Sequence, residues 1–386
     1  MSKSVCVFTS TRADFGMLTP LLKCIQANDF FSLHLLVSGT HLSSQHGKTI
    51  EEILAEGYTA YDCVDIGIER QSVSDIFGTA VTEFGKYFQS KTFDILIVLG
   101  DRYEALAVAT AAYLHQLPIA HIAGGETTIG VLDEAFRHSI TKMASIHFTT
   151  TNTYRQRVIQ LGEHPDSVHN VGGLFIDNTH ANQLITKDIL FKDLGIPDSV
   201  LIAVITYHPE TLSELNARES FKQLSNALVQ CNNLYCLFTY ANADHSGAEI
   251  NKLIDEFVID NSYRSQVRPS LGSRRYLSLL KVANIVIGNS SSGIVEAPSF
   301  KLPTVNIGDR QKGRIMAPSI VNCPCDQESI TKAINYALSE SHLDKCKRDD
   351  DTHGDGSAAQ KIVGILANKL AQGIRLQKSF YDLVQS

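Results

Sequence analysis

The sequence predicts an α/β protein made of two Rossmann-like, doubly wound halves. In the first half, short apolar runs typical of buried strands alternate with segments of helical apolar spacing. The same alternation restarts after Gly-Ile-Pro at 195–197. A chain of 386 residues, 44% of them hydrophobic, is long enough for two or three domains with separate cores. This pattern indicates βαβ units around a mainly parallel sheet.

The elements of the first half follow one another in strand–helix order. Apolar stretches predict strands at 5–9, 33–37, 64–66, 93–99 and 118–123. Apolar residues at helical spacing predict helices at 17–27, 48–56, 72–89, 104–115 and 133–144. We therefore expect an N-terminal Rossmann-like domain over residues 1–180.

The second half repeats this organisation. Strands are expected at 200–206, 234–238, 284–288 and 303–308, with helices between them. They predict a C-terminal nucleotide-binding domain over 181–365, and a ligand cleft is expected between the two domains. A long last helix is expected at about 357–385, broken at Gly373. Its final part, 366–386, is expected to brace the N-terminal domain.

Composition excludes several classes of function. The formal net charge of -7 gives no basic surface for nucleic acid. No run approaches the ~20 apolar residues of a membrane span. Residues 1–5 lead directly into a strand-like run and do not resemble a signal peptide, so we expect a cytoplasmic protein. The cysteines and histidines form no metal-binding motif, so neither a metal nor another cofactor is expected.

Acidic residues follow two neighbouring strands of the predicted sheet. Asp101 comes directly after the run at 93–99, and Glu126 follows the run at 118–123. Ligands of open parallel sheets bind at the carboxyl ends of the strands, so these side chains are expected to share a pocket. Asp133 follows at a predicted helix start. Carboxyl groups gathered in a cleft indicate proton-transfer chemistry and therefore an enzyme.

The helix predicted at 133–144 carries two charged pairs at a spacing of four residues. Asp133 precedes Arg137, and Glu134 precedes His138. Both are equally explained as surface pairs worth a few tenths of a kcal/mol. A functional role for Asp133 depends on its proximity to Asp101 and Glu126.

The best candidate for a phosphate site is the loop Gly-Asn-Ser-Ser-Ser-Gly at 288–293, between a strand and a helix. The free backbone N–H groups and the positive end of the helix dipole would favour an anion. Glu296, one turn later, could bind a ribose diol. An ordinary helix cap explains the same residues equally well.

Cationic side chains also follow predicted strand ends, namely those of Arg12, His208, Arg310 and Arg314. Cations gathered in a cleft would balance the charge of a diphosphate without a metal. Each one taken alone is also explained as a surface residue.

These motifs together resemble the hydrolysing UDP-N-acetylglucosamine 2-epimerases of sialic acid and legionaminic acid pathways. The resemblance covers nearly the whole chain, in the segments 11–16, 100–102, 124–126, 133–142, 288–296 and 308–311. It implies a GT-B architecture with the nucleotide sugar between two Rossmann-like domains. By analogy, it also implies a homodimer.

The resemblance assigns roles to individual residues. It implies that Asp101 and Asp133 are catalytic carboxylates, that Ser290 and Ser291 bind phosphate and that Glu296 binds the ribose. Around the diphosphate and the sugar it implies Arg12, Arg102, His208, Asn242, Arg310 and Arg314.

The chain departs from the family pattern at one position. Many members have a catalytic glutamate just before the two glycines at 124–125, where this chain has Ala123. Glu126 is then a candidate third acid, and the departure is consistent with a branch that uses a modified sugar such as a 2,4-diacetamido-trideoxyhexose.

The implied reaction is elimination of UDP to a 2-acetamidoglucal, followed by hydration to the manno sugar. Three other functions fit the same motifs: a non-hydrolysing epimerase, a GT-B glycosyltransferase and a nucleotide-sugar sensor without activity. Fold alone does not separate them.

Overall fold

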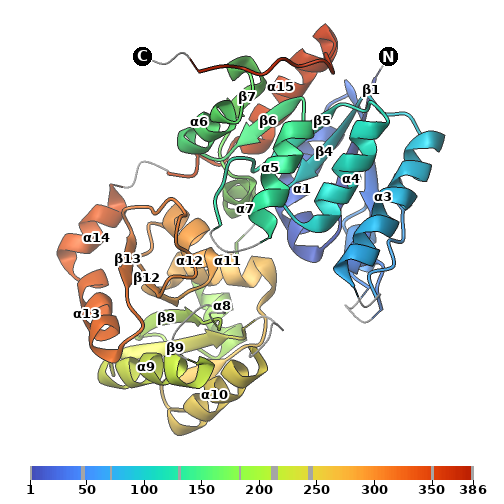
Figure 1. Cartoon of the computed structure of the whole chain (residues 1–386). Coiled ribbons are helices and arrows are strands. Elements are labelled where there is room, and N and C mark those ends of the chain that lie inside the picture. The colour runs from blue at the N-terminus through green and yellow to red at the C-terminus, as the bar shows by residue number, and fades with distance from the viewer. Residues whose placement is uncertain are drawn as a thin grey trace. The chain divides into compact units, whose positions relative to one another are not determined.

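The computed structural model describes residues 2–44, 48–69, 72–128, 132–181, 184–209, 216–241, 247–348 and 352–383. The chain divides into two compact units, which are described separately (Figure 1). Unit 1 comprises Met1–Ala181 and His353–Ser386, and unit 2 comprises Asn182–Thr352. Each unit contains one parallel sheet flanked by helices, so the predicted α/β class with two doubly wound sheets is confirmed.

The sheet of unit 1 has seven strands in the order β3-β2-β1-β4-β5-β6-β7. Its strands are β1 (Lys3–Thr9), β2 (Phe31–Val37), β3 (Tyr61–Cys63), β4 (Ile95–Leu99), β5 (Ile119–Ile122), β6 (Ile146–Thr149) and β7 (Val168–Asn170). Its helices are α1 (Arg12–Gln26), α2 (Ile50–Ala55), α3 (Val73–Ser90), α4 (Tyr103–Leu114), α5 (Asp133–Met143), α6 (Asn152–Gln160), α7 (Leu174–Ala181) and α15 (Ala358–Gln372). The strand order reverses between β1 and β4, so ligands are expected at the carboxyl ends of these two strands.

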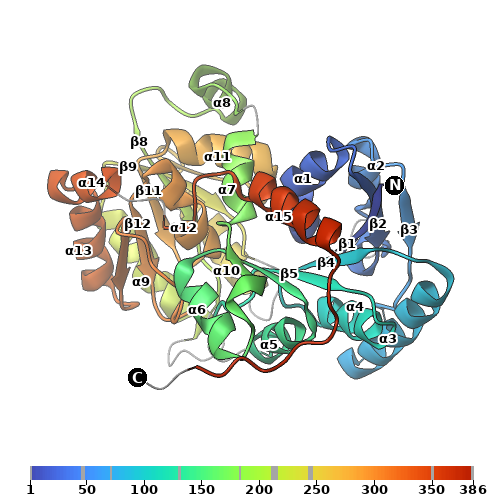
Figure 2. The same ribbon diagram turned by 90° about the horizontal axis from the view of Figure 1, so that it is seen from above.

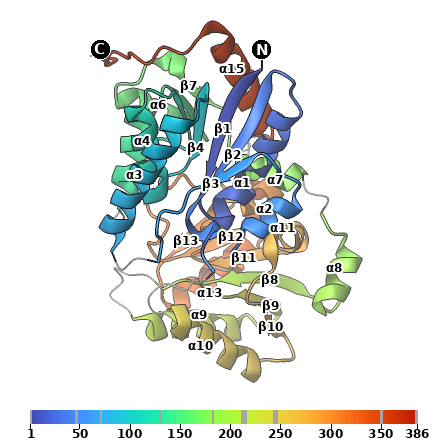
Figure 3. The same ribbon diagram turned by 90° about the vertical axis from the view of Figure 1, so that its right-hand side faces the viewer.

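Alternate residues of the central strands supply two apolar cores, one on each face of this sheet. On β1, Val5 and Val7 pack with residues of α1 and α15, whereas Cys6 and Phe8 pack with residues of α3 and α4. Figure 3 shows α3 and α4 on one side of the strands, with α1 and α15 on the other. Because both faces are buried, the central strands are nearly continuously apolar, as parallel sheets require.

The sheet of unit 2 has six strands in the order β10-β9-β8-β11-β12-β13. Its strands are β8 (Leu201–Thr206), β9 (Leu234–Thr239), β10 (Ser265–Val267), β11 (Ile285–Gly288), β12 (Thr304–Ile307) and β13 (Ile320–Cys323). Its helices are α8 (Lys187–Leu194), α9 (Ala217–Gln230), α10 (Gly247–Asp260), α11 (Gly272–Val282), α12 (Ser291–Val295), α13 (Gln327–Ala337) and α14 (Glu340–Lys347). The strand order reverses between β8 and β11. The loop 288–293, here called the serine loop, begins at the end of β11. A side chain at Gly288 would collide with the carbonyl oxygen of Thr206 on β8.

The expected helix at 357–385 is wrong in its second half. Helix α15 begins where the buried carboxylate of Asp177 accepts backbone N–H groups of Ala358 (3.0 Å) and Ala359 (2.6 Å). It ends at Gln372, and Gly373 has a φ of 83°. The chain then continues without regular structure to residue 383, because its residues contact the loop after α6 instead of forming a further helical turn.

A second difference concerns the third strand, which lies at Tyr61–Cys63 and not at 64–66. Asp62 within it bonds to His34 of β2 (2.8 Å) and to Lys91 (3.1 Å). A polar edge strand held by side chains has no apolar run to reveal it. In the described ranges of the chain, no helix is both long and apolar enough to cross a membrane.

Candidate active site

The guanidinium of Arg137 on α5 connects several segments of unit 1, and this residue is only 2% exposed. Its Nε donates to Asp101 Oδ2 at 2.9 Å, and its Nη2 donates to the same oxygen. Its Nη1 donates to Glu134 Oε2 and to the backbone oxygen of Glu126, both at 2.6 Å. Its Nη2 also reaches Thr128 Oγ1 at 3.1 Å. Arg137 therefore joins the loops after β4 and β5 to the first turns of α5.

Asp101 and Asp133 lie near each other at this end of the sheet. Asp101 follows β4 and has a side chain 28% exposed, while Asp133 is the first residue of α5. Burial, and then the negative charge of Asp101, raise the pKa of Asp133. One carboxylate is thus held by a buried arginine, and its neighbour has a raised pKa. Two carboxyl groups in such different environments suit paired base and acid roles.

Glu126 is held differently from these two acids. Its carboxylate Oε1 accepts a hydrogen bond from the hydroxyl of Thr150 (3.2 Å), just after β6. The loop reaches this position through left-handed residues, with φ of 67° at Ala123 and 80° at Gly125. A Cβ at Gly125 would collide with the backbone oxygen of Tyr154. The structure therefore brings Asp101 and Asp133 together and bonds the third predicted acid to Thr150, just after β6.

His121 on β5 was not among the predicted site residues, although it supports the same loops. It is fully buried, with Nε2 2.8 Å from the carbonyl oxygen of Gly100 and Nδ1 3.1 Å from Thr141 Oγ1. Burial lowers the pKa of His121 to about 3, so the ring is neutral. Nε2–H donates to the carbonyl and Nδ1 accepts from the hydroxyl. A histidine inside an otherwise apolar strand was the signal that could have revealed it.

Acid is expected to destabilise the protein through this histidine. Its folded pKa of about 3 lies below the ordinary value of 6.5, so the unfolded state binds more protons as the pH falls below 6.5. Between pH 7.5 and pH 5, the free energy of unfolding should fall by about 2 kcal/mol through this group. Urea unfolding of wild type and His121→Gln at both pH values measures the difference. An equal pH dependence in the two proteins would contradict the assignment.

Two predicted substrate-binding arginines of unit 1 form ion pairs within the unit. The side chain of Arg12, at the start of α1, is 61% exposed and pairs with Glu52 of α2 at 3.1 Å. Arg102 precedes α4, and its Nη2 lies 2.9 Å from Oε1 of the fully buried Glu104. Arg102 is thus tied close to Asp101, while Arg12 lies at the carboxyl end of neighbouring β1.

The serine loop of unit 2 is organised by the buried side chain of Asn289. Its Oδ1 accepts from the backbone N–H of His208 (2.7 Å), and its Nδ2 donates to the His208 carbonyl (2.8 Å). Arg310 Nη1 donates to the Asn289 carbonyl at 3.0 Å. Ser290 caps α12 through the N–H of Ser292 (3.4 Å), and Ser291 follows as an exposed first residue. The loop, His208 and Arg310 are therefore assembled at one edge of this sheet.

Glu296 directly follows α12, and burial raises its pKa although a hydrogen bond with Ser292 opposes this. The Ser292 hydroxyl donates to Tyr276 Oη at 2.7 Å, which fixes the side chain below the loop. Arg314 is half-buried, and its backbone N–H donates to the carbonyl of Gln311 (3.2 Å). Asn242 lies outside the described residues.

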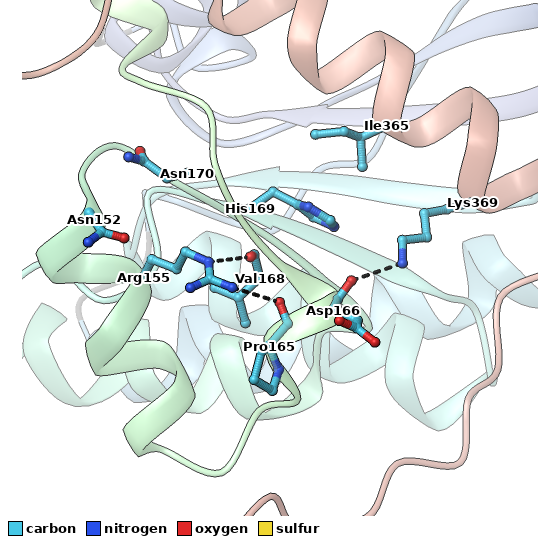
Figure 4. A pocket seen from close by; sticks show the side chains of 9 residues that line it. All are labelled: Asn152, Arg155, Pro165, Asp166, Val168, His169, Asn170, Ile365 and Lys369. Carbon is cyan, nitrogen blue, oxygen red and sulfur yellow. Dashed lines mark hydrogen bonds between the residues drawn. The ribbon is translucent and has the colours of Figure 1, made fainter. Parts of the chain in front are cut away.

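Unit 1 also contains an open pocket of about 720 Å³ beside α6, β7 and α15 (Figure 4). Its cationic side chains bond to backbone carbonyls. Arg155 donates to Val168 (2.9 Å) and Pro165 (3.2 Å), and Lys369 donates to Asp166 (2.9 Å). These bonds explain both cationic side chains as structural. The lining of the pocket comes from elements other than the loops of Asp101 and Asp133.

Comparison with known proteins identifies the family. The profile described as UDP-N-acetylglucosamine 2-epimerase matches residues 23–367. The chain is 35% identical to the polysialic acid biosynthesis protein P7 of Escherichia coli over 387 aligned residues, covering 99% of this chain and 98% of that protein. It is 38% identical to the hydrolysing GDP/UDP-N,N'-diacetylbacillosamine 2-epimerase of Campylobacter jejuni over 326 residues, covering 83% of this chain and 85% of that protein.

A solved structure agrees at the level of the fold. The UDP-GlcNAc 2-epimerase of Neisseria meningitidis, bound to UDP-GlcNAc, superposes with a TM-score of 0.76 at 17% identity, covering 95% of this chain and all of that one. The resemblance seen in the sequence motifs is thereby confirmed. The chain belongs to the UDP-N-acetylglucosamine 2-epimerase family.

Proposed function

We propose that the protein is a hydrolysing 2-epimerase that converts UDP-GlcNAc and water to ManNAc and UDP. The observation that carries this proposal is the pair Asp101 and Asp133, one bonded to a buried arginine and the other with a raised pKa. Hydrolysis of the bond between the sugar and UDP is supported by the relative of Campylobacter jejuni that is named as hydrolysing.

In the first step, the bond between C1 and the UDP oxygen breaks, and UDP leaves with the bonding electrons. As positive charge develops at C1, the C2 proton becomes acidic and is transferred to the carboxylate of Asp101. The products of this step are a 2-acetamidoglucal and UDP. The serine loop, Arg310 and His208 of unit 2 stabilise the charge of the leaving diphosphate.

In the second step, the glucal is hydrated with inversion at C2. Asp133 in its protonated form, which its raised pKa favours, gives a proton to C2 from the opposite face. Water adds its hydroxyl to C1, and its remaining proton returns to Asp133. Asp101 releases the proton taken in the first step to solvent. The sum is one nucleotide sugar and one water converted to ManNAc, UDP and a proton.

Turnover of UDP-GlcNAc in deuterated water, followed by proton NMR, tests this function. The expected products are free UDP and ManNAc that carries deuterium at C2. UDP-linked manno sugar at equilibrium would instead identify a non-hydrolysing epimerase, and a requirement for an acceptor would identify a glycosyltransferase. Binding of the nucleotide sugar without any turnover would identify a sensor.

A second candidate substrate is a UDP-2,4-diacetamido-2,4,6-trideoxyhexose. The relative with 38% identity is named for such a sugar, and Ala123 departs from the family glutamate. Turnover of this nucleotide sugar but not of UDP-GlcNAc would assign the protein to that branch. The expected homodimer stays a prediction, which light scattering of the purified protein would check.

The serine loop is expected to bind the diphosphate. The double variant Ser290→Ala/Ser291→Ala should bind UDP at least about a hundredfold more weakly, because each of the two hydroxyl bonds to a charged phosphate contributes about 1.5–3 kcal/mol. Isothermal titration calorimetry with UDP measures the change. The control is Ser225→Ala, which removes an exposed hydroxyl from α9 of the same unit. Unchanged UDP affinity in the double variant would favour the plain helix cap.

A further inference from the structure

The segment 373–383, here called the C-terminal strap, runs from the end of α15 along unit 1 (Figure 2). The backbone N–H of Tyr381 donates to the carbonyl of Gly162 at 2.9 Å. Gly162 has a φ of 90°, and the ring of Phe380 occupies the space that a Cβ there would need. Gly162 therefore allows the turn after α6 and leaves the space that the ring of Phe380 occupies. The strap is held by specific contacts on the loop after α6.

Beside this loop lies a buried ionic cluster, here called the Glu163 junction, formed by Glu163, Lys142, His147 and Lys378. The carboxylate of Glu163 is 2% exposed, with Oε1 2.5 Å from Lys142 and Oε2 2.7 Å from Lys378 and 3.1 Å from His147. Burial alone would raise the pKa of Glu163, but the bonds from His147 and the two lysines outweigh it and lower the pKa to about 2. The junction therefore joins the strap, α5 and β6 through one carboxylate.

The strap also provides a hydrogen bond at the carboxyl end of α5. Lys378 Nζ donates to the carbonyl of Ala144, the C-cap residue of that helix, at 2.7 Å. Lys142, in the last turn, donates to the carbonyl of Leu161 at 3.0 Å. The last carbonyls of a helix have no partners within it, and cations near them are favoured by the helix dipole. Lys378 thus supplies a bond that the end of α5 requires.

Helix α5 contributes Ile140 and the partly buried Met143 to the apolar core that it shares with α3 and α4. Of its residues, only Arg137, Ile140 and Thr141 are buried. Its location is set by this packing and by polar bonds at its two ends, namely those of Arg137 at the start and the Glu163 junction at the finish. A helix of this length spans roughly 15 Å and moves as a rigid rod, so a displacement at one end reaches the other.

We propose that Lys378 of the strap is a positioning residue, which acts through the Glu163 junction to hold α5 so that Asp133 and Arg137 stay beside Asp101. This inference rests on the proposed function for its effect on turnover. It assigns the strap a role in catalysis although none of its residues belongs to the predicted site.

The test compares Lys378→Met with Lys378→Arg and with the control Lys361→Met. Lys361 forms an exposed ion pair with Asp355 near the start of α15, so its loss removes a lysine of the same unit away from α5. Lys378→Met is expected to lower kcat about tenfold with KM and UDP affinity nearly unchanged, because small displacements of catalytic groups slow the chemical step. Lys378→Arg should restore turnover, and Lys361→Met should match the wild type. An unchanged kcat in folded Lys378→Met, or an equal loss in Lys361→Met, would overturn the proposal.

Hydrogen exchange gives a readout that does not depend on the substrate. Amides in the first turns of α5 should exchange faster in Lys378→Met than in wild type or Lys361→Met, and unchanged exchange there would contradict the positioning role. If Lys378→Met does not fold, Phe380→Ala takes its place in the exchange experiment and should likewise speed exchange in the first turns of α5. The exposed ring of Phe380 can be removed while Glu163 keeps its bonds to Lys142 and His147. If wild type converts none of the nucleotide sugars, the proposed function fails, and the exchange result still decides the role of the strap.

Discussion

Replacing Asp101 with asparagine is expected to lower kcat by about a thousandfold or more. In the proposed mechanism this carboxylate takes the C2 proton, and positioned general acid–base groups contribute about 10²–10⁴ in rate. The asparagine amide has nearly the same shape but cannot serve as the base. UDP affinity should stay close to that of wild type, because Asp101 is proposed to act on the sugar, whereas the serine loop, Arg310 and His208 are proposed to bind the diphosphate. Steady-state kinetics with the substrate identified by NMR, together with UDP titration, measure both effects.

The matched control for this variant is Asp94→Asn, at the opposite end of β4. Asp94 accepts bonds from the Lys3 ammonium (2.9 Å) and from the backbone N–H of Ser4 (2.8 Å), so it is a structural carboxylate next to the same strand. Asp94→Asn should lower stability without lowering kcat. Near-normal turnover by Asp101→Asn would exclude Asp101 as the base.

Replacing Arg137 with methionine is expected to lower the free energy of unfolding by about 3–5 kcal/mol. Removing one partner from a buried ion pair leaves the other charge without compensation, and here Asp101, Glu134 and the carbonyl of Glu126 each lose a donor. Urea unfolding monitored by circular dichroism measures the change. Arg137→Lys should recover only part of it, since an ammonium cannot reproduce the planar fork of a guanidinium.

Arg275→Met is the comparison for this second prediction. Arg275 forms a similar ion pair with Asp193, at 2.7 Å, but its side chain is 52% exposed. Exposed pairs contribute about 0–1 kcal/mol, so this variant should be nearly as stable as wild type. Equal losses in the two variants would show that the Arg137 network has no special role in stability.

The sheets could be predicted because their central strands are apolar on both faces. Residues 95–99 and 285–288 lie in such strands, and the acids and serines that follow them were placed at carboxyl strand ends by topology alone. Strands interrupted by polar residues were harder to see. The strand 146–149 contains a buried histidine, His147, which interrupts the apolar run and finds its partner, Glu163, sixteen residues later.

The hydrogen bonds and ion pairs of the candidate site could not be predicted in the same way. Helical spacing suggested Asp133 as the partner of Arg137, but the guanidinium bonds to Asp101, which is 36 positions away in sequence. The orientation of Glu126 depends on left-handed backbone at Ala123, a conformation that alanine rarely adopts. Tertiary bonds decide both cases, and local propensity does not report them.

Unit 1 is made of two segments that lie before and after unit 2 in the sequence, and this affects the order in which the two units can fold during synthesis. The core on one face of its sheet is completed by Ile362, Leu366 and Leu370 of α15, which the ribosome adds only after the whole of unit 2. Domains generally fold as units during translation, so unit 2 has all its residues available before unit 1 does. Until α15 emerges, the apolar residues of α1 that pack in the same core lack these partners. In a nascent or prematurely terminated chain, unit 1 therefore has an incomplete core while the chain of unit 2 is complete.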